Sequence, residues 1–110
     1  MFGTEDQHVI RPAVEDAKRI GIDAVGPLAG DTVFLKASRG EFDVAVAQYH
    51  DQGHIPVKLI AFNDAVNVTL GLPIFRTSVG HGTAYDIAWK GYASPSGIKA
   101  AIDYVHKFAP

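Results

Sequence analysis

Apolar residues recur at helical spacing in the first part of the chain. Between residues 9 and 20 they fall three or four positions apart, and Gly21 follows as a suitable C-cap, which predicts a helix. Thr4 and Gln7 have the spacing of a capping box, in which each side chain satisfies a backbone N–H of the other. Pro12 either costs this helix one backbone hydrogen bond or marks its first turn.

The closing helix has the clearest pattern of all. Ser94 is a suitable N-cap, and Pro95 suits the first helical position. Four apolar residues then form one stripe along the predicted helix: Ile98, Ala101, Ile102 and Val105.

The middle of the chain alternates between strand-like and helix-like runs, which indicates an α/β fold. Apolar and β-branched residues predict strands, and a run of mixed pattern predicts a loop with a short helix. For IPVKLIAF, a helix beginning at Pro56 and an extended run are both open. The predicted strands are IDAVGPL (22–28), FDVAVAQ (42–48), AVNVTLGL (65–72) and IFRTSVG (74–80), with a break at Leu72-Pro73 between the last two and the short helix in AGDTVFLKASRG (29–40).

Polar groups are concentrated in residues 49–58, YHDQGHIPVK, directly after the predicted buried strand at 42–48. Strand ends of this kind form the ligand edge of open α/β sheets. His50 and His54 would share one face of a helix and could bind a metal together, but Gly53 argues against a regular helix there. His50 alone fits either a metal ligand or acid/base group, or a hydrogen-bonded histidine at a strand end.

Three further polar residues, Lys58, Asn67 and Arg76, fall nine positions apart on successive predicted elements. Lysine and arginine offer positive charge to a phosphate or carboxylate, and arginine can bind it through two hydrogen bonds. Asn67 lies in an apolar strand, where an unpaired amide would be costly. The alternative is that all three are ordinary surface or capping residues.

A short loop, His81-Gly82-Thr83-Ala84, follows the last predicted strand and is followed by Asp86. Glycine and small side chains allow backbone amides to approach a ligand closely. A nearby acid can accept hydrogen bonds from both ribose hydroxyls of an adenosine. The alternative is a tight turn in which Asp86 caps a short helix.

Composition narrows the class of protein. The 110 residues suffice for one domain or for part of a larger enzyme, and a hydrophobic content of 47% is that of a folded chain. The net charge of −2 argues against a nucleic-acid partner, and the absence of cysteine excludes disulfides and thiolate sites. No apolar run reaches membrane-span length, and the N-terminus has no signal-peptide pattern, so a cytoplasmic protein is expected.

Taken together, YHDQGHIPVK, AVNVTLGLPIFRTSV and HGTAYDIA resemble the C-terminal part of the 4-hydroxythreonine-4-phosphate dehydrogenases of vitamin B6 biosynthesis. The opening FGTEDQHVIRPAVEDAKRIGI and the GDTVF segment are also in register, so the resemblance covers residues 1–110. It implies the C-terminal segment of an isocitrate/isopropylmalate dehydrogenase-like fold. The implied reaction is NAD-dependent, metal-dependent oxidation of a four-carbon hydroxy-acid 4-phosphate, followed by loss of carbon dioxide.

The resemblance also implies roles for single residues. His50 matches a metal-ligand histidine of the family, for a divalent ion that could be zinc, magnesium, cobalt or manganese. Lys58, Asn67 and Arg76 match substrate-binding residues, and no catalytic acid or base is assigned. The loop His81, Gly82, Thr83 and Ala84 with Asp86 matches the adenosine-binding loop, where the acid favours NAD over NADP.

The chain departs from the family pattern at three points. Gly80 replaces the usual aspartate, Trp89 replaces a glycine, and neither His54 nor His81 matches the remaining metal ligands. Family members are longer homodimers whose metal site draws on both subunits. The chain is therefore expected to be a partial C-terminal domain that carries part of an active site and is inactive alone.

Two alternatives to this function remain open. The chain could be a catalytically inactive remnant or an interaction module that pairs with a full-length homologue. A metal-dependent hydrolase built on His50, Asp51 and His54 is less well supported because it lacks further ligands. Within the family, His54 and the I-P-V-K run are closer to the branch acting on threonate or erythronate 4-phosphate.

Overall fold

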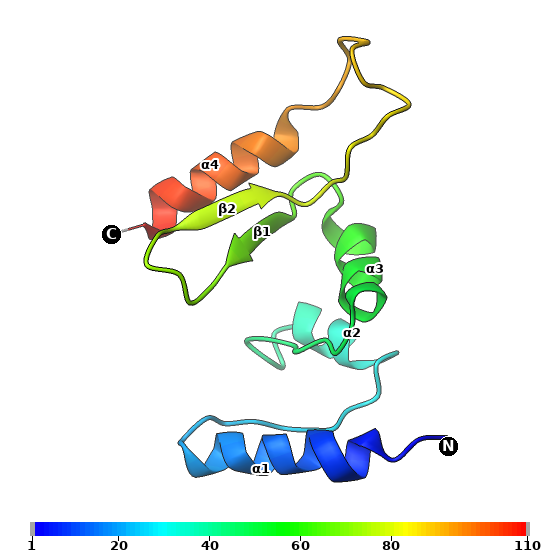
Figure 1. The fold of residues 1–110 in the computed structure, drawn as a ribbon, viewed down its shortest axis with the longest axis vertical. Coiled ribbons are helices and arrows are strands. Elements are labelled where there is room, and N and C mark those ends of the chain that lie inside the picture. The colour runs from blue at the N-terminus through cyan, green and yellow to red at the C-terminus, as the bar shows by residue number, and fades with distance from the viewer. Residues whose placement is uncertain (1, 110) are drawn as a thin grey trace. The chain divides into compact units, whose positions relative to one another are not determined.

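Two compact units, Met1–Val46 and Ala47–Pro110, make up the computed structural model, which describes residues 2–109. In the first unit a π-helical turn, η1 (Asp6–Ile10), runs directly into α1 (Arg11–Arg19), and α2 (Val33–Ser38) follows. The second unit contains a helix, a two-stranded sheet and a closing helix (Figure 1).

The first helix ends as predicted but begins differently. The N–H of Gly21 donates to the carbonyl of Lys18, and the φ of +89° at Gly21 is the left-handed conformation that a C-cap glycine supplies. Pro12 lies in the first turn of α1, so it marks a first turn rather than breaking a helix. The prediction of a capping box is wrong. The Thr4 backbone carbonyl, not its side chain, accepts from the Gln7 N–H, and no side chain caps the start of η1.

Two of the four predicted strands do not form. Residues 22–28 and 42–48 lie outside any strand, and the side chains of Val44 and Val46 are 76% and 80% exposed. A β-branched run becomes a strand only when another strand satisfies its backbone groups. Neither run has such a partner among residues 2–109. The short helix predicted in 29–40 is confirmed by α2.

Helix α3 (His50–Ala61) spans the segment that the sequence left divided between a loop and a helix. It begins after the extended N-cap Tyr49 and includes both Gly53 and Pro56. The Gln48 N–H donates to the Gln52 side-chain oxygen over 2.7 Å, which stabilises the first turn. The prediction that His50 ends a buried strand is therefore wrong, because His50 begins a helix.

The strands predicted at 65–72 and 74–80 are confirmed, and they form a hairpin. Strands β1 (Val66–Thr69) and β2 (Arg76–Val79) pair antiparallel, with Val66 opposite Val79 and Thr69 opposite Arg76. The predicted break at Leu72-Pro73 lies in the connection between them.

Helix α4 (Ser96–Phe108) packs along one face of this hairpin (Figure 1). Its buried residues are Gly97 and Ala101, and the Thr77 hydroxyl donates to the Ala101 carbonyl over 3.1 Å. The Ser94 hydroxyl accepts from the Ser96 N–H, close to its predicted capping role. Ile98 and Ile102 are half-exposed, so the predicted apolar stripe is rotated toward Gly97, Ala101 and Tyr104. Between residues 2 and 109, no helix is long and apolar enough to cross a membrane.

Candidate functional site

The face of the hairpin that points away from α4 is entirely polar. Because side chains alternate along a strand, Val66, Val68, Thr77 and Val79 form the α4 side. The other face therefore carries Asn67, Thr69, Arg76 and Ser78. Asn67 lies directly opposite Ser78, and it is exposed. The expectation of a buried amide at Asn67 is wrong, since only its sequence neighbours on the strand face the helix.

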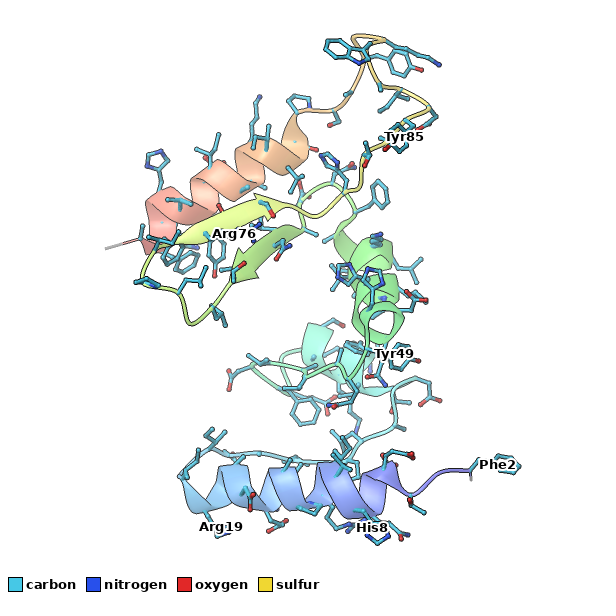
Figure 2. The ribbon with its side chains drawn as sticks, in the orientation of Figure 1. Phe2, His8, Arg19, Tyr49, Arg76 and Tyr85 are labelled. Carbon is cyan, nitrogen blue, oxygen red and sulfur yellow. The ribbon has the colours of Figure 1, made fainter. Side chains whose placement is uncertain are left out.

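Arg76 is the only charged residue of the hairpin. Residues 65–80 contain no acid, no lysine and no histidine. The Arg76 Nη1 donates to the Thr69 hydroxyl oxygen over 2.7 Å, and no ion pair within residues 2–109 includes Arg76. The guanidinium is thus held by a neutral partner and keeps its positive charge uncompensated on this face. Arg76 is labelled in Figure 2.

Lys58 is not part of this polar face. It lies in the last turns of α3, exposed, whereas the helix that packs on the sheet is α4. The structure therefore brings Asn67 and Arg76 together on one sheet face and leaves Lys58 on a separate element of the same unit.

Three polar side chains at the start of α3 make two pairwise contacts. His50 Nδ1 lies 2.7 Å from Asp51 Oδ1, and the imidazoles of His50 and His54 stack with centroids 4.1 Å apart. Both histidines therefore do share a helix face, and the objection based on Gly53 is wrong. A carboxylate on one ring nitrogen is the usual orientation of a metal-binding histidine, which suits His50 as a single ligand. Across residues 2–109, however, no group of three or more potential ligands is assembled.

The loop after β2 is irregular. The His81 Nδ1 lies 2.9 Å from the Gly82 carbonyl oxygen, and the Ile87 N–H donates to the Ala84 carbonyl in a turn that contains Asp86. Asp86 is exposed and lies in a turn rather than at the start of a helix, so the capping alternative is wrong. Ala84 has a φ of +49°, a left-handed conformation that is uncommon for residues other than glycine. Tyr85, labelled in Figure 2, marks this loop.

Sequence reasoning did not find Thr69 and Ser78. Each is two positions from a predicted substrate residue on the same strand, Thr69 after Asn67 and Ser78 after Arg76. The period-2 alternation of a strand would have placed them on the same face, had it been applied to the polar positions as well as to the apolar ones.

Comparison with known protein families shows to which family this chain belongs. The family model described as pyridoxal phosphate biosynthetic protein PdxA matches residues 1–105. The chain belongs to the PdxA family. This confirms the resemblance to the 4-hydroxythreonine-4-phosphate dehydrogenases.

Among PdxA-family relatives, the 4-hydroxythreonine-4-phosphate dehydrogenase of Geobacter metallireducens is 60% identical over 102 residues, which are 93% of this chain and 30% of the relative. The D-threonate 4-phosphate dehydrogenase of Salmonella typhimurium is 50% identical over 109 residues, which are 99% of this chain and 33% of that one. The chain thus spans about a third of the length of these relatives.

A solved structure of a PdxA-family protein is also similar. The structure is described as that of a putative 4-hydroxythreonine-4-phosphate dehydrogenase from Salmonella typhimurium. It matches with a TM-score of 0.83 and 49% identity, over 99% of this chain and 33% of that one.

Proposed function

We propose that this chain forms part of the active site of an NAD-dependent dehydrogenase. Its substrate would be 4-hydroxythreonine 4-phosphate or a related four-carbon hydroxy-acid 4-phosphate, which is oxidised and then loses carbon dioxide. Membership of the PdxA family and the names of the relatives support the substrate class. The observation that carries the proposal within this chain is the uncompensated guanidinium of Arg76 on a polar sheet face.

On this proposal Arg76 binds the phosphate or carboxylate of the substrate. Its planar group offers five N–H donors, of which one is occupied by Thr69. Asn67 lies on the same face and can both donate and accept, which suits the hydroxyl and carboxylate oxygens of such a substrate. Lys58 supplies a second positive charge from α3.

The nucleotide would bind at the loop formed by His81, Gly82, Thr83 and Ala84. Gly82 has open space where a side chain would be, so its backbone can be approached closely. Asp86 is exposed next to this loop and can accept hydrogen bonds from the ribose of NAD. The charge of Asp86 would repel the additional phosphate of NADP.

His50 would supply one ligand to a divalent metal, and the remaining ligands would come from outside these residues, including a second subunit of a homodimer. When bound, such a metal would polarise the hydroxyl oxygen on the substrate carbon from which NAD takes the hydride. Asp51 would fix the orientation of the His50 ring through the 2.7 Å contact.

Titration of the isotope-labelled chain, followed by nuclear magnetic resonance, tests the proposal. NAD should shift backbone resonances of residues 80–89, and inorganic phosphate should shift those of the hairpin around Asn67 and Arg76. NADP should bind more weakly than NAD. A folded chain whose resonances respond to neither NAD nor phosphate would contradict the proposal.

A further inference from the structure

Thr69 and Arg76 face each other across the two strands of the hairpin. They are directly paired in the antiparallel register, and the Arg76 Nη1 donates to the Thr69 hydroxyl oxygen over 2.7 Å. A β-branched threonine has a restricted χ1, so the acceptor oxygen itself is held in place. The contact therefore fixes the far end of a long and otherwise freely rotating side chain.

The hydroxyl is a suitable partner for an arginine that must bind an anion. An aspartate or glutamate at position 69 would also hold the guanidinium, but it would neutralise the charge and compete with the ligand. A neutral hydroxyl occupies one N–H and leaves the charge and the other donors available. An arginine that is already ordered loses less conformational entropy when the anion binds.

We propose that Thr69 is a positioning residue that orders the Arg76 guanidinium for binding of a phosphate or carboxylate group. The inference rests on the proposed function in one respect, the assignment of Arg76 to anion binding. It goes beyond that function because it assigns a specific role to a residue that does not itself carry charge.

The test compares three variants of the chain by titration with inorganic phosphate. Thr69→Val keeps the shape and removes the acceptor, and it should raise the dissociation constant about three- to ten-fold, the loss expected for one hydrogen bond of typical net strength. Thr69→Ser restores the hydroxyl and should bring the constant back close to that of the parent chain. Thr77→Val is the matched control, because it removes the hydroxyl that bonds Ala101 on the opposite face. It should lower stability and leave phosphate binding unchanged.

A functional version of the test uses a chimera in which residues 1–110 replace the matching third of the Salmonella typhimurium relative. There Thr69→Val should raise KM for the phosphorylated substrate about three- to ten-fold, with kcat and the KM for NAD nearly unchanged.

Several results would overturn the positioning role. One is a dissociation constant for phosphate that Thr69→Val leaves unchanged, or that Thr77→Val raises equally. Another is a dissociation constant that Thr69→Ser does not bring back toward that of the parent chain. The last is a folded parent chain that does not bind phosphate. The two proposals also fail differently. A chimera that forms no NADH, beside Thr69-dependent phosphate binding by the chain, counts against the proposed function alone. An active chimera that is indifferent to Thr69→Val counts against the positioning role alone.

Discussion

Gly80 is predicted to tolerate a side chain poorly in this chain, where Ala65 lies against it, although its backbone is not left-handed and the family usually has an aspartate at this position. A Cβ added there would lie 2.9 Å from the Ala65 carbonyl oxygen and 3.2 Å from the Ala65 Cβ. Carbon–oxygen contacts ordinarily begin at about 3.3 Å, so the added Cβ and the Ala65 carbonyl oxygen would have to move apart by roughly 0.4 Å. Ala65 cannot easily move by this distance, because its N–H donates to the Ala61 carbonyl and the next residue, Val66, is paired in the sheet.

Gly80→Ala should therefore destabilise the chain by about 1–3 kcal/mol, the usual cost of an overpacked contact. With a urea m-value of about 1–3 kcal/mol per molar, the unfolding midpoint followed by circular dichroism should fall by about 1 M. Gly82→Ala is the matched control, two residues along the same loop, since nothing lies within 4 Å of its added Cβ. The free energy of unfolding of Gly82→Ala should differ from that of the parent chain by less than about 0.5 kcal/mol. Equal midpoints for the parent chain and Gly80→Ala would show that Ala65 does not restrict the side chain at position 80.

Three further substitutions test separate parts of the structure. Trp89→Gly should raise the free energy of unfolding by about 0.5–1 kcal/mol, because Trp89 has a φ of +62° and a fully exposed side chain; a lower urea midpoint would contradict this. Arg76→Ala should weaken phosphate binding at least about ten-fold in the titration, with Lys99→Ala as the control that removes an equal charge from α4; equal losses would indicate general electrostatics. Asp86→Lys should lower the preference for NAD over NADP, measured by titration with both nucleotides, and an unchanged ratio would remove Asp86 from the ribose site.

The elements that the sequence predicts correctly carry their own local signals. The closing helix has Ser94 and Pro95 at its start, and the hairpin has two alternating runs with a proline break between them. Such signals depend on the residues within one element or on adjacent elements. The strand predictions at 22–28 and 42–48 are wrong because a strand needs a partner strand, and the residues of one run do not show whether a partner is present.

The same distinction applies to the candidate site. The sequence indicates Asn67 and Arg76 singly, but only the antiparallel register shows that they share a face and that Thr69 bonds Arg76. The apolar neighbours of Asn67 favour a buried position for it, and alternation places it on the exposed side instead. At α3, Gly53 is a weak helix former but not a prohibitive one, so His50 and His54 stack on a regular helix.

Turnover by the chimera that carries residues 1–110 shows most directly whether these residues form part of a dehydrogenase active site. NADH should form from NAD and a four-carbon hydroxy-acid 4-phosphate in the presence of a divalent metal, with the unmodified relative as the positive control. Arg76→Ala in the same chimera should raise KM for the phosphorylated substrate strongly. A chimera that is folded and binds NAD but forms no NADH would rule out the proposed function and favour an inactive remnant or an interaction module.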